Sequence, residues 1–204
     1  MNDHTHDASH SKESLWQMIL APDGVAAFNR YRQETDYVWL DLSGLDFRNC
    51  DLTGINFSHA SLNHCCLDRA ELAEARLVFT HLLAASCVET SFYQASLEEA
   101  EFKGSVLTGA RFAAASLLGA NLSEVDATQA DFTDADLTNA RFHKALLADA
   151  DFTNANLRHT DFTGADMVWA HVEEAQVDET TRWGKRSFEE EIPEAAKAES
   201  ERSV

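Results

Sequence analysis

The sequence predicts an all-β solenoid, a fold in which a short unit is repeated and stacked along one axis. Every fifth residue from Leu42 to Val177 is apolar, which makes 28 consecutive positions with no insertion or deletion to shift the frame. All but five of them are Leu or Phe. A period of five matches neither the 3.6-residue period of a helix nor the two-residue period of a flat strand. A unit this short cannot bury its own apolar side, so it must stack on its neighbours.

A helical cap is expected before the repeats, at residues 12–38. Residues 12–33 carry two helical patterns of apolar residues, separated by Ala-Pro-Asp-Gly at 21–24. Asp23 is a candidate N-cap for the second helix, because its short side chain can accept hydrogen bonds from free backbone amides. A cap is needed because the open end of a stacked β structure invites aggregation. Residues 1–11 are polar and are expected to be disordered.

The repeat array is expected over residues 39–181. A second register, two residues before the first, holds mostly small residues from Ala95 to Ala170, so two residues of every five point inward. Gly, Asn and Asp recur two places after the large residue, and these types favour turns and tolerate positive φ. Each unit is therefore interpreted as one short extended side followed by a corner.

Several units share the pattern Ala-[Asp/Asn]-[Leu/Phe]-x-x, among them residues 130–134, 135–139, 150–154 and 155–157. This pattern resembles the pentapeptide repeat family, and the resemblance covers about two thirds of the chain. It implies a right-handed quadrilateral parallel β-helix with four units per turn, hence about seven coils here. It also implies that residues 24–32 form the N-terminal capping helix of many bacterial members.

A second cap is expected after the array, within residues 182–204. Trp183 and Phe188 are the large apolar residues placed to close the last coil. The rest of this segment is rich in Glu and Ala, and we expect it to fray as an acidic tail.

The charge of the chain is strongly acidic, with 35 acidic and 16 basic residues and a formal net charge of −19. Residues 40–180 alone hold 23 acidic and 8 basic side chains. Such a surface repels nucleic acid and anionic membranes, because binding to either needs Lys and Arg. It attracts a basic protein partner and speeds the encounter. We therefore expect a protein partner, with no direct nucleic-acid or membrane binding.

The location is expected to be cytoplasmic. No basic-apolar signal segment opens the chain, and no apolar run reaches the roughly 18 residues of a membrane span. Cys50, Cys65 and Cys87 fall on the two inward registers, and buried free thiols suit a reducing compartment. Export without a cleaved signal is the alternative.

Departures from the repeat mark two candidate protein-contact surfaces. One side of the rod, here called the Phe47 side, has the inward residues Phe47, Leu67, Cys87, Leu107, Ala127, Leu147 and Met167. Its outward apolar residues are Val88, Val106, Leu146, Val168 and Trp169. A second group circles one coil on consecutive sides, as Val78, Phe79, Leu83, Val88 and Tyr93. Exposed apolar residues that cluster indicate a contact surface, including a homodimer contact. The alternatives are that they are scattered or are covered by a terminal segment.

The aspartates of the second half of the array form columns along the rod, and they are candidates for a DNA-mimicking surface. These residues are Asp126, Asp131, Asp134, Asp136, Asp151, Asp161 and Asp166. Asp131 and Asp151 should lie one coil apart on one side, about 5 Å from each other. Like charges this close oppose stacking. The alternative interpretation is that each short side chain accepts a hydrogen bond from a neighbouring backbone amide.

No enzyme is predicted, and neither cofactor nor metal. A rod filled to its axis offers no cleft, and the sequence has no nucleophile motif, Gly-rich phosphate loop or CxxC. The first hypothesis is a non-enzymatic binding module or scaffold that presents a rigid acidic rod to a protein partner. The second follows from the family resemblance: some members resemble B-form DNA in width and charge and protect DNA gyrase from quinolones. This array has no projecting loop, and the chain ends in a polar tail, in which it differs from many gyrase-protecting relatives.

Overall fold

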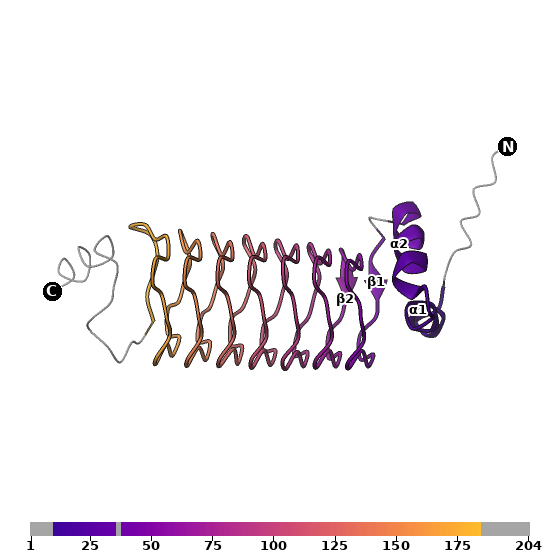
Figure 1. Ribbon diagram of the computed structural model, residues 1–204, viewed down its shortest axis with the longest axis horizontal. Helices are drawn as coiled ribbons and strands as arrows, with labels where there is room; N and C mark the ends of the chain where they lie inside the picture. Colours follow the sequence, from indigo (N-terminus) through magenta and orange to yellow (C-terminus); the bar gives the residue numbers. More distant parts are fainter. Residues whose placement is uncertain (1–9, 36–37, 185–204) are drawn as a thin grey trace.

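The computed structural model describes residues 10–35 and 38–184. Figure 1 shows a straight stack of coils with two helices, α1 (Lys12–Ile19) and α2 (Gly24–Glu34), across its N-terminal end. Among the described residues only β1 (Leu40–Asp41) and β2 (Ala60–Ser61) are longer than one residue, and they pair in parallel. The architecture is the predicted right-handed quadrilateral parallel β-helix.

The register from coil to coil is 20 residues, which corresponds to four five-residue units per turn. Single-residue parallel bridges repeat it along the rod, from Asp46 with Cys66 to Asn156 with Gln176. The last bridge joins Asp161 to Arg182 and is one residue longer. The extra residue is absorbed by a turn in which the Thr181 amide bonds the Asp178 carbonyl at 3.2 Å. The family resemblance predicted four units per coil, and the insertion lies just past the last in-frame position, Val177.

The core is the large register. All its residues from Leu42 to Val172 are buried, with exposures of 3% or less, whereas Val177 in the terminal coil is half-buried. Aromatic rings stack along the axis where Phe recurs at 20-residue spacing: Phe112, Phe132 and Phe152 are parallel within 5°, with centroids 4.9 Å apart. Ring spacing thus equals coil spacing, and a ring in this column contacts the coils before and after it.

The corners confirm the interpretation of the turn positions. The residue two places after each large residue has positive φ at every unit from Gly44 to Glu174. In most units the amide that follows bonds back to the large residue's carbonyl, as in Cys50 to Phe47 at 3.1 Å. A four-residue turn with φ above zero at its third position favours Gly or Asn. Phe79 and Trp169 occupy such corners, although bulky side chains rarely adopt this backbone.

Hydroxyl residues in the small register have a common role. Thr80, Thr90 and Thr160 are fully buried, and each donates to the carbonyl of the large residue 23 positions earlier, at 2.7–2.9 Å. Ser105 and Thr181 repeat this geometry. Because a buried hydroxyl needs a partner, these positions tolerate Thr or Ser in place of Ala.

The N-terminal cap covers the first coils through apolar and polar contacts. Phe28 of α2 is buried against Phe57, with ring centroids 5.5 Å apart. Asn29 accepts from the Asn56 amide at 2.8 Å and donates to the Gly54 carbonyl at 2.9 Å. These two backbone groups at the open end are thereby paired, and the helices cover part of the exposed edge. Arg32 is also buried and donates to the carbonyls of residues 35, 38 and 58.

Three expectations about the ends and the thiols need adjustment. Ser11, expected in a disordered tail, caps α1 by accepting from the Ser14 amide, while residues 1–9 lie outside the described part. Asp23 stands at the N-cap of α2 but makes no side-chain capping bond. Cys65 and Cys87 are buried as expected, whereas Cys50 is only half-buried.

At the C-terminal end, Trp183 stacks on Phe162 with centroids 5.5 Å apart and planes 4° from parallel. Phe188, expected beside it, lies outside the described residues. Within the described part of the chain, no helix has the length and apolarity needed to cross a membrane.

Candidate protein-binding surface

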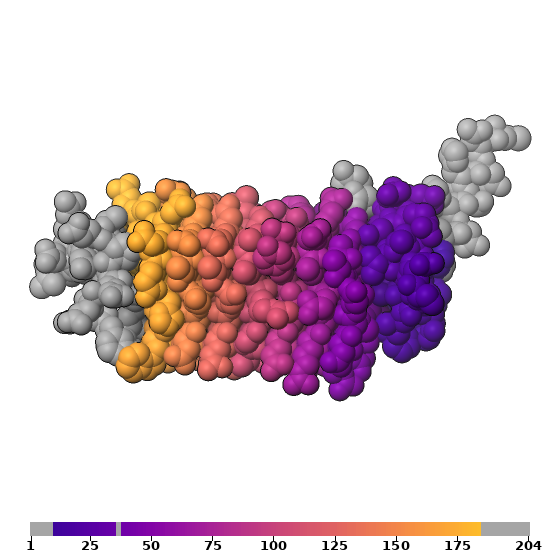
Figure 2. Space-filling model, in the orientation of Figure 1, coloured from indigo at the N-terminus to yellow at the C-terminus, as the bar shows by residue number. Residues whose placement is uncertain are grey.

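Within the described residues, the outer surface of the rod is the part that a partner can contact, because the interior is filled. Figure 2 shows one face of it as a continuous wall of side chains. Three residues of each unit line this wall: the one before the buried large residue and the two after it.

The predicted aspartate columns are present. Asp131 and Asp151 are bridge partners in adjacent coils, and Asp126 and Asp166 share a column with Leu146 between them. Six of the seven candidate aspartates accept a hydrogen bond from the backbone amide two residues later: Asp126, Asp131, Asp136, Asp151, Asp161 and Asp166. Asp134 instead occupies an exposed corner with φ of 58°.

These bonds support the structural interpretation of the aspartate pattern. The oxygen that accepts from the amide often accepts from a threonine hydroxyl as well, as Asp136 does from Thr138 at 2.6 Å. A carboxylate has room for about four hydrogen bonds, so it can hold the turn and still present its charge to solvent. The same residues therefore shape the corner and make the surface acidic.

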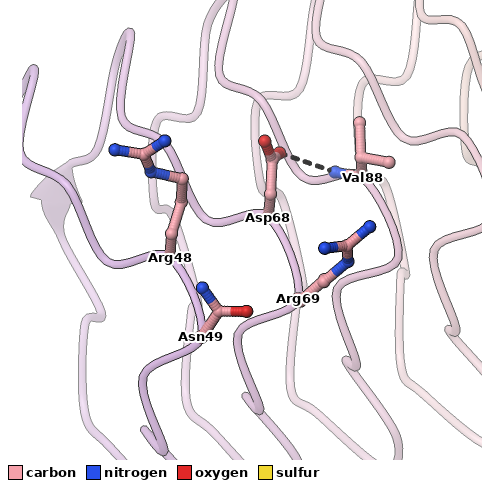
Figure 3. A pocket seen from close by; sticks show the side chains of 5 residues that line it. All are labelled: Arg48, Asn49, Asp68, Arg69 and Val88. Atoms are coloured by element: carbon pink, nitrogen blue, oxygen red, sulfur yellow. Dashed lines mark hydrogen bonds between the residues drawn. The ribbon is translucent and has the colours of Figure 1, made fainter.

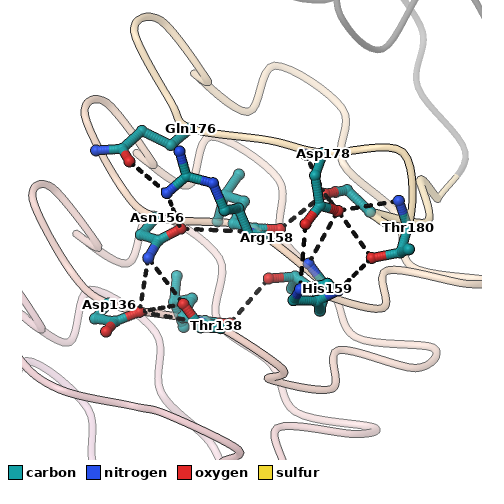
Figure 4. A network of polar contacts seen from close by, with 12 residues as sticks. Asp136, Thr138, Asn156, Arg158, His159, Gln176, Asp178 and Thr180 are labelled. Atoms are coloured by element: carbon teal, nitrogen blue, oxygen red, sulfur yellow. Dashed lines mark hydrogen bonds and ion pairs between the residues drawn. The ribbon is translucent and has the colours of Figure 1, made fainter.

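A polar network lies near the C-terminal end of the rod (Figure 4). It belongs to the Phe57 side, which is the side whose buried column starts at Phe57. Asn156 donates to the Asp136 carboxylate at 3.2 Å and to the Thr138 hydroxyl at 2.8 Å. Asp178 accepts from the amide and hydroxyl of Thr180. Desolvation acts to raise the pKa of Asp178, but the hydrogen bonds to its carboxylate outweigh this effect and the pKa is lowered. Asp136 and Asp178 also link adjacent coils, because Asp136 accepts from Asn156 and Asp178 accepts from the His159 amide at 3.3 Å.

Other aspartate pKa values are lowered by bonds made within a single unit. The Arg48 side chain, which donates to Asp46, holds the pKa of that carboxyl at about 2. The Thr53 hydroxyl and amide lower the pKa of Asp51, and the Ser43 amide lowers that of Asp41. Hydrogen bonds to the charged form favour it, so these groups stay ionised well below neutral pH.

The apolar residues of the Phe47 side do not form one continuous patch. Leu146 is half exposed at 50%, but Asp126 and Asp166 are its column neighbours on either side. Val106 lies beyond Asp126, and Val88 lies one coil earlier still. The structure leaves a smaller group in the last two coils, consisting of Leu146, Val168 and Trp169. Charged and apolar residues therefore alternate along the column, as in the scattered alternative, and a contact surface on this side stays a prediction.

The residues that circle one coil are also separated by the geometry. Val78 and Phe79, Leu83, Val88 and Tyr93 lie on four successive sides, so no flat partner surface reaches all of them. Phe79 and Tyr93 are about half exposed, while Leu83 and Val88 are half-buried. Any contact surface here must use one or two sides.

Shallow hollows occur in the wall among the described residues. One, of about 300 Å³, is lined by Arg48, Asn49, Asp68, Arg69 and Val88. In Figure 3 the Asp68 carboxylate lies between the two arginines and accepts from the Val88 amide at 3.0 Å. Both guanidinium groups already pair with acids, Arg48 with Asp46 and Arg69 with Glu89. This hollow is therefore an ion-pair network that is satisfied internally.

The second hollow, of about 380 Å³, surrounds Tyr93. Ala73 and Ala113 precede and follow Tyr93 in the same column and line the hollow with it. Arg111 spans two coils to reach Glu71 at 3.1 Å. Neither hollow has the enclosure expected of a catalytic pocket, and the described residues contain no group of His, Cys, Asp and Glu that could hold a metal ion.

One aromatic cluster was missed by the sequence analysis. His59 and Phe79 occupy the same corner in successive coils and stack at 5.4 Å, and Trp39 meets His81 edge-on at 4.6 Å. The signal was available, since positions 39, 59 and 79 are 20 residues apart. The apolar register was counted from Leu42, however, so Trp39 was not aligned with the corner positions 59 and 79.

Comparison with known proteins supports the fold. Residues 41–77, 70–109 and 85–123 match the model "Pentapeptide repeats (8 copies)", and residues 106–181 match "Pentapeptide repeat region". No curated protein sequence matches the chain.

Solved structures with a similar chain course include Rfr23, a pentapeptide repeat protein from the cyanobacterium Cyanothece 51142 (23% identity, 76% of this chain and 97% of that one, TM-score 0.35). Another is HetL, involved in heterocyst differentiation regulation in Nostoc sp. strain PCC 7120 (22% identity, covering 74% of this chain and 94% of that one, TM-score 0.22). Full-length QnrB1, a plasmid-mediated fluoroquinolone resistance protein, is a third (18% identity, covering 69% of this chain and 84% of that one, TM-score 0.24). The family models together span the array from 41 to 181, and with the 20-residue register they show that the chain belongs to the pentapeptide repeat family.

Proposed function

We propose that the protein is a non-enzymatic binding module that presents a rigid acidic rod to a protein partner. The observation that carries this proposal is the separation of roles within each unit. The large and small registers fill the interior, whereas the 23 acidic and 8 basic side chains of residues 40–180 occupy outward positions. Binding is the chemistry that such a surface supports.

Rigidity favours this role. Backbone hydrogen bonds join successive coils on all four sides, for example Phe132 to Asp151 at 2.7 Å and Leu137 to Asn156 at 2.9 Å. A surface that is already ordered loses little conformational entropy when it binds. An acidic surface also steers a basic partner toward it, and this steering weakens as salt screens the charges.

A capture experiment from lysate at low and raised salt tests the proposal. The matched variant replaces Asp126, Asp131, Asp151 and Asp166 by Asn, which keeps an oxygen that can accept from the backbone amide and removes the charge. We expect basic proteins to be retained at low salt, to be released at high salt and to be lost from the Asn variant. Retention that ignores both salt and the variant would contradict an acidic binding surface.

The second candidate is a DNA mimic that modulates DNA gyrase. The favouring observation is the column in which Asp131 and Asp151 are direct neighbours in adjacent coils, a stacked arrangement of negative charge. A supercoiling assay with gyrase, with and without a quinolone, tests it. Protection that is lost in the Asn variant supports this candidate, and no effect at micromolar protein removes it. Both candidates imply a cytoplasmic location, which free cysteines at positions 50, 65, 66 and 87 suit.

A further inference from the structure

The corner beside the N-terminal cap combines aromatic, apolar and acidic residues in one place. We call it the aromatic–carboxylate surface and define it as Trp39, Val78, Phe79, Glu98, Glu99 and Leu118. Trp39 and Phe79 are each 49% exposed, and Leu118 is 41% exposed. The Trp39 ring contacts His81, two residues after Phe79, and exposed aromatic residues are types that dominate protein interfaces.

Phe79 is an unusual residue for its corner, where its ring stacks on His59 of the preceding coil at 5.4 Å. Its corner position has φ of 55°, and the equivalent residues of later coils, Gly119 and Asn139, are types that suit this conformation. An L-residue with a bulky side chain costs about 1–2 kcal/mol there. Since half of the ring remains in solvent, burial returns little of that cost. Backbone strain combined with exposure is a pattern that points to function.

The carboxylates lie next to the rings by register. The Phe79 amide bonds the Glu98 carbonyl at 3.0 Å, and the Glu99 amide bonds the Leu118 carbonyl at 2.9 Å. One oxygen of Glu98, Oε2, is shielded from solvent and accepts no hydrogen bond within the described residues. Arg76, at the opposite edge of the same side, contributes one positive charge. The local balance is therefore acidic, and it complements a cation from a partner.

The spacing selects the shape of the partner. Val78 and Leu118 occupy one column two coils apart, with Glu98 between them, so the apolar residues are separated by about 10 Å along the rod. Residues i and i+7 of an α-helix are about 10.5 Å apart on one face, and i+3 or i+4 lies midway. An extended strand repeats its face every ~6.6 Å, which matches neither one coil nor two.

We propose that the aromatic–carboxylate surface binds an amphipathic helix of a partner protein laid along the rod. Apolar side chains at i and i+7 contact Val78 with Phe79 at one end and Leu118 at the other. A Lys or Arg at i+3 or i+4 pairs with Glu98 and Glu99, and Trp39 extends the apolar contact toward the cap. The inference rests on the proposed binding function and names the class of partner and its place on the rod.

The test uses a synthetic helical peptide of Ala, Leu and Lys with Leu at i and i+7 and Lys at i+3 and i+4, titrated into the full chain by calorimetry. Phe79→Asn removes the ring and suits the corner backbone, so loss of binding cannot be attributed to misfolding. We expect this variant to weaken binding about tenfold. Glu99→Gln should weaken it about threefold and reduce its salt dependence.

Two matched controls isolate the site. Trp169→Asn removes an aromatic corner outside the surface, and Asp149→Asn removes a corner charge on the Phe47 side; each should change binding by less than about twofold. A peptide with Glu in place of Lys should not bind. Equal losses from Trp169→Asn and Phe79→Asn, or no saturable binding to the wild type, would overturn the inference. If salt-sensitive capture from lysate persists while the peptide fails, the binding function stands and only this site is wrong.

Discussion

Removal of one ring from the axial stack should destabilise the rod strongly. Phe132 is fully buried, and its centroid lies 4.9 Å from those of Phe112 and Phe152 and 5.5 Å from that of Phe142. Truncation of a buried Phe to Ala costs about 3–5 kcal/mol. Three ring contacts, each worth about 0.5–1.5 kcal/mol beyond burial, are lost together. We therefore expect Phe132→Ala to lie near the upper end, at about 4–5 kcal/mol.

Two controls separate the contributions to this loss. Phe132→Leu keeps an apolar side chain that the same column already accommodates at Leu52 and Leu72, so it should cost only about 1–2 kcal/mol. Thr108→Ala changes an outward residue whose hydroxyl makes no hydrogen bond among the described residues, and it should stay within about 0.5 kcal/mol. The ordering Ala, then Leu, then the surface variant follows directly from the ring geometry.

Denaturant unfolding followed by circular dichroism measures these differences. A stacked array can open coil by coil, so the slope with denaturant must be compared between variants as well as the midpoint. Hydrogen exchange adds a local readout, because amides of the coils that contain Phe112 and Phe152 should lose the most protection. Equal destabilisation by Phe132→Ala and Thr108→Ala would refute the assignment of inside and outside on which the fold is built.

Three further predictions concern the surface. Asp131→Asn keeps an oxygen for the Thr133 amide and relieves repulsion from Asp151, so it should raise the free energy of unfolding at low salt by about 0.3–1 kcal/mol. Asp131→Ala removes the acceptor and should lower the free energy of unfolding by about 1 kcal/mol. Identical changes in urea midpoint for the two variants would contradict this prediction. Because the pKa values of Asp41, Asp46 and Asp51 are lowered in the folded chain, their stabilisation is fully present above about pH 4–5 and is lost as the pH falls through the folded values, near 2 for Asp46. The melting temperature should therefore fall between about pH 4 and pH 2, and a flat or rising profile would count against it. Since aspartates flank Leu146, we expect light scattering to give the same mass for wild type, Leu146→Asn and Trp169→Asn; a change from dimer to monomer would show that this side is a homodimer contact.

The interior of this protein could be predicted from the sequence because burial acts with one fixed period. Each large residue is followed five positions later by another that faces the same axis. The apolar pattern can therefore be recognised whichever residues occupy the outward positions. The number of units per coil came from the family resemblance, since a period of five alone does not fix how many sides a tube has. The extra residue near Asp178 was not predictable, because it lies where the apolar register ends.

The surface was harder to predict, because neighbours there are separated by 20 residues and belong to different units. Leu146 looked like part of an apolar side until Asp126 and Asp166 were placed on either side of it. The aspartates were expected in columns, with a backbone hydrogen bond as the alternative interpretation, and most of them do accept a bond from the amide two residues later. Arrangement of the sequence in rows of 20 recovers these neighbours, but the hydrogen bonds require coordinates.

The separation between interior and surface also indicates where to look for function in this fold. An outward residue contributes little to the core, so a substitution there rarely alters the rod. Most outward positions follow local rules: short acids accept from the turn, and small or flexible residues occupy the corners. Phe79 and Trp169 break the corner rule while remaining about half exposed, at 49% and 58%. Departures from local preference are expected at functional sites. Phe79 has carboxylates and a second apolar residue at helix spacing along its side, whereas Trp169 lies on the side where acids interrupt the apolar column, and this difference favours the corner near the N-terminal cap as the binding site.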